Sequence, residues 1–116
     1  MQYIEEKLES KTADYARALK SLQEELEAVS YYQQRAVTAT DSELKDIVGH
    51  NRDEEIEHAC MLIEWLRRNM EGWDERLRTY LFTSAPLTEV ESGEGGKAGG
   101  SEGDLSIRAI RYSELK

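Results

Sequence analysis

Glu55 and His58 are the two residues whose types and spacing most clearly indicate chemistry. Residues at positions i and i+3 lie on one face of a helix, so this carboxylate and this imidazole can reach the same metal ion. Helical bundles that hold two metal ions use two such Glu-x-x-His pairs together with two further glutamates. The chain contains one Glu-x-x-His pair, so it supplies at most half of a di-metal site.

Two long helices are expected to position these groups. The first covers about residues 5–38, a stretch without glycine or proline that is rich in helix-forming residues. A stripe along this helix, with alternating spacings of three and four, consists of Tyr15, Ala18, Leu22, Glu25, Val29, Tyr32 and Ala36. Every member except Glu25 is apolar or amphipathic. Because a buried charge is costly unless a partner or a metal compensates it, Glu25 is a candidate ligand.

The second helix is expected over about residues 42–70, after a capping box formed by Thr40 and Glu43 and before Gly72. Its stripe is apolar at both ends and polar in the middle, and consists of Leu44, Val48, Asn51, Glu55, His58, Leu62 and Trp65. A short turn makes the two helices antiparallel. The middle of one stripe then lies opposite the middle of the other, which places Glu25 opposite Glu55 and His58.

A third, shorter helix is expected over about residues 73–82, with Pro86 marking its end. Two long helices and a short one cannot cover their own apolar stripes, so we expect self-association. The predicted fold is all-α. It is an antiparallel two-helix hairpin plus a short C-terminal helix, which dimerises into a four-helix bundle.

The candidate ligands favour iron, manganese or zinc, because carboxylate and imidazole groups without a thiolate suit these metals. Glu25, Glu55 and His58 are too few to hold two metal ions in one chain. A two-fold axis through this face doubles them to four carboxylates and two imidazoles, which is the ligand set of a di-metal bundle. Tyr32, on the same stripe as Glu25, could hydrogen-bond a ligand, act as a redox-active phenol, or simply pack.

A second stripe on the first helix holds Glu24, Glu27 and Tyr31. Its oxygen atoms could attract incoming cations and pass them to the metal site. The same residues could equally form a solvated face. The spacing alone leaves both interpretations open.

Other polar residues near Glu55 and His58 have simpler interpretations. Glu54 and Glu57 flank the ligand pair and are expected to face solvent. His50 and Glu54, at positions i and i+4, form a rival metal-binding pair, but this pair lies off the main stripe. Cys60 is expected to be a small core residue.

The composition excludes several classes of partner. The chain has 116 residues, a formal net charge of −9 and a pI of about 4.7. Such an acidic surface argues against binding to nucleic acid or to an anionic membrane. The single cysteine rules out an intrachain disulfide, no apolar run is long enough to cross a membrane, and the first residues lack the layout of a signal peptide. We therefore expect a cytoplasmic protein.

Residues 92–103 are predicted to form a flexible linker, because they contain six of the eight glycines. Residues 104–116 follow and begin with apolar side chains at alternate positions. A flexible linker that ends in a short apolar segment usually delivers that segment to a partner. A frayed tail or a cloning remnant is the alternative interpretation.

Four segments strongly resemble the encapsulated ferritins: residues 24–35 (EELEAVSYYQQR), 50–59 (HNRDEEIEHA), 64–68 (EWLRR) and 77–83 (LRTYLFT). The match covers about residues 18–86. The resemblance implies a ferritin-like helical domain over residues 1–91, with a ferroxidase centre that forms across a dimer and with dimers arranged in a decameric ring. It also implies that Glu25, Glu55 and His58 are the ligands of a di-iron centre and that Tyr32 lies beside it.

Encapsulated ferritins oxidise Fe(II) to Fe(III) with dioxygen and lie inside an encapsulin shell, which stores the iron. The resemblance therefore implies a ferroxidase located in an encapsulin nanocompartment of the cytoplasm. Glu24 and Glu27 match acidic positions that bind calcium or another divalent cation near the entrance to the site. Tyr31 stands where some relatives carry tryptophan.

A C-terminal loading peptide behind a flexible linker attaches these proteins to the shell. Leu105, Ile107 and Ile110 are similar to the apolar pattern of that peptide, whereas Arg108 and Ala109 stand where glycine and serine are usual. Two other functions remain open. One is a non-catalytic hairpin module for oligomerisation, and the other is a related di-iron or di-manganese enzyme such as a peroxidase.

Overall fold

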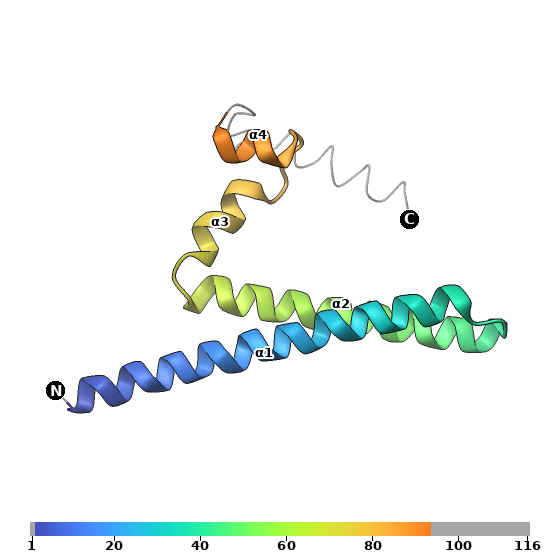
Figure 1. Cartoon of the computed structure of the whole chain (residues 1–116), viewed down its shortest axis with the longest axis horizontal. Coiled ribbons are helices and arrows are strands. Elements are labelled where there is room, and N and C mark those ends of the chain that lie inside the picture. Colours follow the sequence, from blue (N-terminus) through green and yellow to red (C-terminus); the bar gives the residue numbers. More distant parts are fainter. Residues whose placement is uncertain (1, 94–116) are drawn as a thin grey trace. The chain divides into compact units, whose positions relative to one another are not determined.

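The computed structural model describes residues 2–93, with side chains from residue 9 onward, and this part of the chain is built from helices alone. The helices are α1 (Gln2–Thr38), α2 (Ser42–Asn69), α3 (Trp73–Tyr80) and α4 (Leu87–Ser92), as labelled in Figure 1. The predicted all-α class is confirmed. The chain divides into two compact units, with the boundary between Met70 and Glu71.

The first unit is the predicted hairpin. Figure 1 shows α1 and α2 side by side and running in opposite directions, joined by a short turn. The carboxylate of Asp41 caps α2 by accepting a hydrogen bond of 2.9 Å from the backbone N–H of Leu44. The predicted capping box of Thr40 and Glu43 is therefore wrong by one residue. Asp41 is the last extended residue before the helix, so its side chain reaches the free N–H groups first.

The hairpin is held together by a narrow apolar seam. Its buried residues are Ala18, Leu22 and Ala36 from α1 and Val48, Ala59 and Leu66 from α2. Beyond this seam the two helices leave large apolar side chains exposed, namely Leu19, Leu26 and Val37 on α1 and Leu44, Ile47, Ile56 and Met61 on α2. The predicted apolar stripe of α2 is therefore wrong in including Leu44. This residue is half exposed, because it lies in the first turn of α2.

Side-chain contacts connect α1 and α2 at the end of the hairpin that lies away from the turn. The hydroxyl of Tyr15 donates a hydrogen bond of 2.9 Å to the backbone carbonyl of Asn69, near the C-terminus of α2. The rings of Tyr15 and Trp65 meet edge to face, with their centroids 6.3 Å apart. The two helices are thus connected at the turn and again at Asn69, the last residue of α2.

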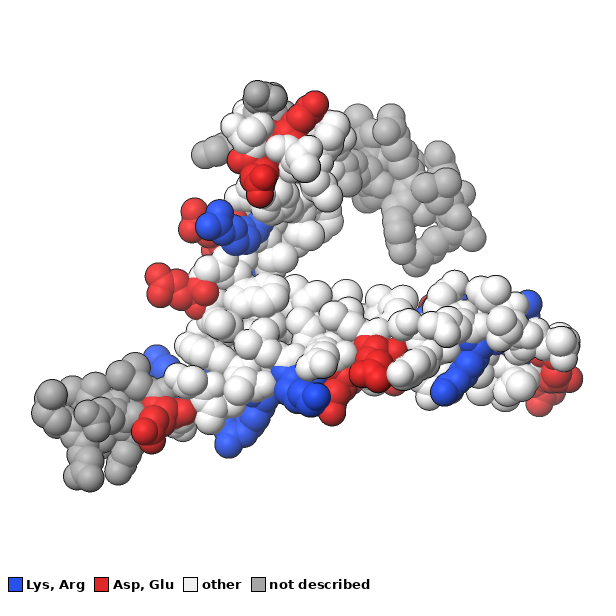
Figure 2. Space-filling view, in the orientation of Figure 1, with Lys and Arg blue, Asp and Glu red and all other residues white. Residues whose placement is uncertain are grey.

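Acidic and basic side chains alternate along the described surface of the hairpin, with uncharged stretches between them, as Figure 2 shows. Within α2, Glu64 forms ion pairs with Arg67 and Arg68, each at 2.6 Å. The two guanidinium groups hold the pKa of Glu64 at about 2. None of the described helices combines the length and the apolar character that a membrane span requires.

The second unit begins at Glu71, and its second residue, Gly72, has a φ of 101°, in the left-handed region that favours glycine. The described part of this unit, residues 71–93, contains α3 and α4, and the buried residues within it are Thr83 and Val90. The helix α4 was not predicted. Pro86 was expected to mark the end of the third helix, but α3 ends at Tyr80 and Pro86 caps the start of α4, because its fixed φ suits the beginning of a helix.

Residues 94–116, which hold most of the predicted linker and the whole predicted loading peptide, lie outside the described residues. Ser92, at which the linker was expected to begin, is the last residue of α4. The division of the chain into a helical domain, a linker and a peptide therefore stays a prediction.

Candidate metal centre

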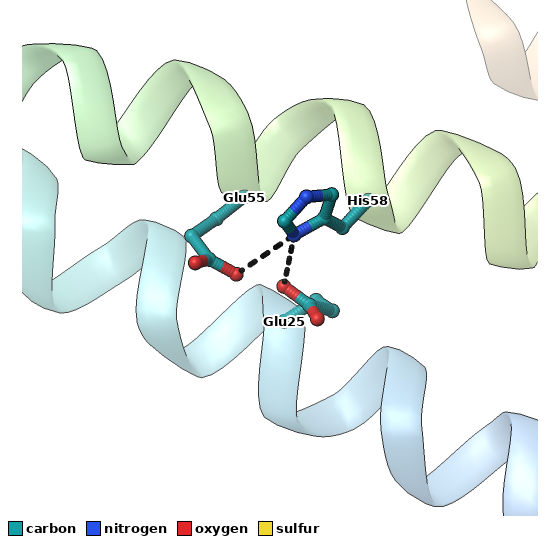
Figure 3. A group of neighbouring side chains, drawn as sticks. All are labelled: Glu25, Glu55 and His58. Carbon is teal, nitrogen blue, oxygen red and sulfur yellow. Dashed lines mark ion pairs between the residues drawn. The ribbon is translucent and has the colours of Figure 1, made fainter.

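Three side chains converge at the middle of the hairpin, as predicted from the two stripes. Glu25 projects from α1, and Glu55 and His58 project from neighbouring turns of α2 (Figure 3). One ligand atom from each residue lies within 4.8 Å of the other two. The Nδ1 atom of His58 is 3.5 Å from Oε2 of Glu25 and 3.5 Å from Oε2 of Glu55. A single ion could contact all three groups after small side-chain rotations.

The apolar seam explains why these polar groups face one another. Ala18 and Leu22 precede Glu25 on α1, and Ala59 and Leu66 follow the ligand pair on α2. Burial of these residues turns one side of each helix towards the other helix, and the candidate ligands occupy positions that are close to the seam in the helical repeat. The sequence places charge here by interrupting an otherwise apolar stripe.

The site is only partly enclosed within one chain. The exposed fraction of the side chain is 25% for Glu25, 24% for Glu55 and 41% for His58. One edge of His58 therefore remains open to the surroundings of the hairpin. Such a half-open arrangement suits a site that a second chain completes.

The surroundings in the cluster shift the pKa values of two of these groups, Glu25 and His58. Hydrogen bonding with Glu55, burial, and repulsion by the Glu55 charge raise the pKa of Glu25, and the attraction of His58 only partly opposes them. Burial lowers the pKa of His58, but the neighbouring carboxylates of Glu25 and Glu55 outweigh it, so the net shift is upward. Without a metal ion, Glu25 and His58 retain protons to a higher pH than the isolated side chains would.

One oxygen of the cluster is left without a proper partner. Oε2 of Glu25 is buried and accepts no well-formed hydrogen bond, since His58 at 3.5 Å is at the limit of such contacts. Buried carboxylate oxygens normally accept a hydrogen bond. The lack of one at Oε2 is therefore consistent with a role for this atom in binding a cation between the three groups. Two carboxylates and one imidazole form a donor set for iron, manganese or zinc.

Tyr32 lies on the same helix as Glu25 but outside this cluster. Its ring is half buried, and its hydroxyl takes part in none of the hydrogen bonds found in the described residues. Instead, the guanidinium carbon of Arg35 lies 5.4 Å from the centre of the Tyr32 ring and 5.9 Å from that of the Tyr31 ring. Sequence reasoning missed Arg35, although its spacing of three and four from these tyrosines is a usable signal.

The second predicted stripe is exposed. Glu24, Glu27 and Tyr31 are all accessible, and the Tyr31 hydroxyl donates a hydrogen bond of 3.0 Å to Oε1 of Glu27. This hydrogen bond, together with the negative charge of Glu27, raises the pKa of the Tyr31 phenol. Glu27 already has one oxygen engaged, and Glu24 belongs to no three-ligand cluster in the described residues. A cation-binding entrance at these residues stays a prediction.

The remaining predictions near the ligand pair had mixed outcomes. Glu54 and Glu57 are exposed, as expected. His50 and Glu54 do approach one another, with Nε2 and Oε1 3.5 Å apart, but they are a highly exposed pair without a third ligand in the described part of the chain. The interpretation of Cys60 as a core residue is wrong for this chain. Cys60 is exposed, because it follows the buried Ala59 and is therefore turned about 100° away from the seam.

Comparison with known proteins gives the family. The sequence model of the EncFtn-like family matches residues 1–84, which is most of the chain. The chain belongs to the EncFtn-like family. The encapsulated-ferritin resemblance of the four sequence segments is thereby confirmed.

Three relatives illustrate how far the similarity extends. A "Ferritin-like protein" from Thermotoga maritima is 57% identical over 103 residues, which are 89% of this chain and 90% of that protein. An "Encapsulated ferritin-like protein" from Rhodospirillum rubrum is 50% identical over 110 residues, or 94% of this chain and 77% of that protein. The crystal structure of protein ne0167 from Nitrosomonas europaea has 55% sequence identity and a TM-score of 0.64, covering 66% of this chain and 84% of that one.

Proposed function

We propose that this protein is a ferroxidase that oxidises Fe(II) to Fe(III) with dioxygen. The observation that carries the proposal is the convergence of Glu25, Glu55 and His58, with ligand atoms within 4.8 Å of one another and with Oε2 of Glu25 buried but unsatisfied. Membership of a ferritin-like family supports iron as the metal. The carboxylates bind Fe(II) as the substrate, and their negative charge stabilises the Fe(III) product more strongly.

We further propose that two chains complete the centre. One chain offers three ligand side chains, which are too few to hold two iron ions. A two-fold axis beside His58, the most exposed of the three, would bring a second identical set to the same place. Two Fe(II) ions then lie close enough to give one electron each to the same dioxygen molecule, which with two protons yields hydrogen peroxide.

The protein's own residues have defined tasks in this reaction. Glu25 and Glu55 bind Fe(II) as carboxylates, and His58 binds it through a neutral ring nitrogen. Six protein ligands shared by two ions leave coordination positions free for dioxygen. Tyr32, held against Arg35, is proposed to border the centre, and Glu24 and Glu27 are proposed to attract calcium, Fe(II) or another divalent cation towards it.

The setting of the reaction is also a proposal. The Rhodospirillum rubrum relative is named as an encapsulated protein, which supports packaging of this chain in an encapsulin nanocompartment in the cytoplasm. The C-terminal residues around Leu105, Ile107 and Ile110 would attach it to the shell, and dimers would assemble into a decameric ring. The shell, rather than this chain, would store the oxidised iron.

A non-catalytic hairpin module is the second candidate. In the absence of metal, His58 lies within ion-pair distance of both Glu25 and Glu55, so the cluster could serve to hold α1 against α2. This reading predicts a protein without stoichiometric metal. Native mass spectrometry separates the two functions, because a ferroxidase centre should hold iron on dimers or larger assemblies and not on monomers.

Replacement of a ligand tests the ferroxidase directly. His58→Ala and Glu55→Ala should each lower the rate of Fe(II) oxidation by more than the roughly 10–100-fold that follows loss of a residue outside the ligand shell. The rate is measured from the absorbance of Fe(III) after mixing with Fe(II) in air. His50→Ala is a matched control, because His50 pairs with a glutamate on the same helix but outside the cluster. Full activity in both ligand variants would exclude the proposed centre.

A further inference from the structure

The two helices of the hairpin are joined by a polar contact close to the metal cluster. Arg52 on α2 donates a hydrogen bond of 2.8 Å from Nη1 to Oε1 of Gln33 on α1. Its Nε atom contacts Oδ1 of Asp53 at 3.1 Å, which restrains the same guanidinium from the other side. The Arg52 side chain is 30% exposed, so much of its length lies against the protein.

This contact belongs to a consistent register along the hairpin. In each of three inter-helix pairs, the two residues lie almost equally far from Ser42 in the sequence. The pairs are Tyr15 with Asn69, Glu25 with His58 and Gln33 with Arg52. The metal cluster lies between the other two pairs. Arg52 is also three residues before Glu55, so a restraint on Arg52 acts on the ligand one helical turn away.

The apolar seam restrains this part of the hairpin only loosely. Its buried residues on the turn side of the ligands, around Arg52, are small, namely Ala36 and Val48, whereas the larger Leu22 lies on the other side of Glu25. Small side chains form shallow knobs, which leave α2 more freedom to rotate or slide by a fraction of a turn against α1. Metal ligation tolerates little such freedom, because a misplacement of about 1 Å can cost on the order of 100-fold in activity.

We propose that Arg52 is a positioning residue, whose hydrogen bond to Gln33 holds Glu55 and His58 opposite Glu25 in the geometry that a metal ion requires. Arg52 contacts none of the three ligands and takes no part in the chemistry. The proposal rests on the proposed metal site and adds to it the means by which the two helices are aligned. Guanidinium suits this role because it carries several donors in a rigid plane.

Affinity for Co²⁺ in the absence of dioxygen tests the proposal without any turnover. Arg52→Met and Gln33→Met should each weaken Co²⁺ binding by about tenfold or more and change its visible absorption spectrum, which reports the ligand geometry. The double variant should be no worse than either single one, because one contact is lost in all three. Gln33→Glu keeps an acceptor for Arg52 and should retain the affinity.

Arg17→Met is the matched control. Its guanidinium donates to Asp14 on the same helix at 2.7 Å and joins no second helix, so its loss should leave Co²⁺ binding unchanged. Unaltered Co²⁺ affinity and spectrum in Arg52→Met and Gln33→Met would overturn the proposal. So would a lower thermal stability with unchanged affinity, since that result would make the contact a stabilising bond only.

A metal-free measurement separates this proposal from the proposed function. The crystal structure of the Gln33→Met variant should show α2 displaced against α1 at Glu55 by about 1 Å or more. If the unaltered protein failed to bind Co²⁺, the metal site would be disproved, and this structure would still decide the role of Arg52. Helices that superpose on those of the unaltered protein would contradict it. Gln33 is exposed, so this substitution leaves the apolar seam intact.

Discussion

At the scale of single residues, the central feature is an acid placed where the helix packing calls for an apolar side chain. Glu25 occupies a seam position between Leu22 and Val29, and its Oε2 atom is buried without a proper hydrogen bond. Burying a carboxylate in this way destabilises the metal-free chain. The arrangement makes sense if the group is kept for binding a cation, which is how functional sites commonly depart from the rules of packing.

The protonation of the cluster gives a prediction at this scale. Because the pKa values of Glu25 and His58 are both raised, these groups hold protons at a pH where the isolated side chains would have lost them. A metal ion must displace the protons, so affinity for Co²⁺ should decrease as the pH falls, by up to about tenfold per pH unit for each proton displaced. Above the raised pKa of His58 the affinity should be constant.

Calorimetric titration in buffers of different ionisation enthalpy measures this effect, because it counts the protons released. His50→Ala should release the same number as the unaltered protein, since His50 lies outside the cluster. His58→Gln should release fewer. Affinity that does not vary between mildly acidic and neutral pH would show that the three groups are not the ligands.

At the scale of the elements, one glycine lies within a helix that would be more stable without it. Gly49 belongs to α2, and a methyl group added there would meet only Nη2 of Arg52, at 3.8 Å, among the described residues. Gly49→Ala should therefore stabilise the protein by about 0.5–1 kcal/mol, because alanine loses less backbone freedom in a helix. Urea unfolding followed by circular dichroism measures the change.

Gly72 is the contrasting control for that experiment. Its φ of 101° lies in the left-handed region, so Gly72→Ala should destabilise the protein although nothing crowds the position. A stability loss on Gly49→Ala would contradict the first expectation. It would indicate that a second chain approaches α2 at Gly49.

At the scale of the whole molecule, the hairpin is an incomplete structure in two related respects. Its seam is narrow and large apolar side chains such as Leu26, Ile47 and Ile56 remain exposed. Its candidate metal-binding cluster has three side chains, Glu25, Glu55 and His58, and an open edge at His58. A second copy of the chain could correct both defects at once, which is the physical reason for proposing that catalysis depends on assembly.

The C-terminal segment gives the prediction that belongs to this scale. Removal of residues 105–116 should leave the rate of Fe(II) oxidation unchanged, because the metal cluster lies between α1 and α2. The same truncation should abolish packaging when the protein is expressed together with an encapsulin shell protein. Co-purification followed by electrophoresis and by negative-stain microscopy measures packaging.

Two point variants refine this test. Arg108→Gly and Ala109→Ser introduce the residues that are usual in the loading peptides that this segment resembles, and they should maintain or increase packaging. Leu105→Asp should reduce it, because a charged group replaces an apolar one. If the truncated protein still co-purified with the shell, attachment would depend on the helical domain instead.

The sequence alone determined the features that depend on periodicity. The apolar stripes, interrupted only by polar residues at their centres, predicted two antiparallel helices and the meeting of Glu25 with Glu55 and His58, and the structure places these residues together. This was possible because residues three and four apart share a helix face whatever surrounds them, and a short turn leaves little choice of register.

Only the tertiary structure decided features that depend on competition between neighbouring groups. Asp41 rather than Thr40 caps α2, Pro86 begins a helix rather than ending one, and Cys60 is exposed. Each outcome depends on a local choice between neighbouring residues, such as which of two adjacent positions on a helix faces the seam, and composition and spacing do not specify that choice. The same holds for the Gln33–Arg52 contact, because two polar residues at a distance of 19 positions signal no pairing until the helices are packed.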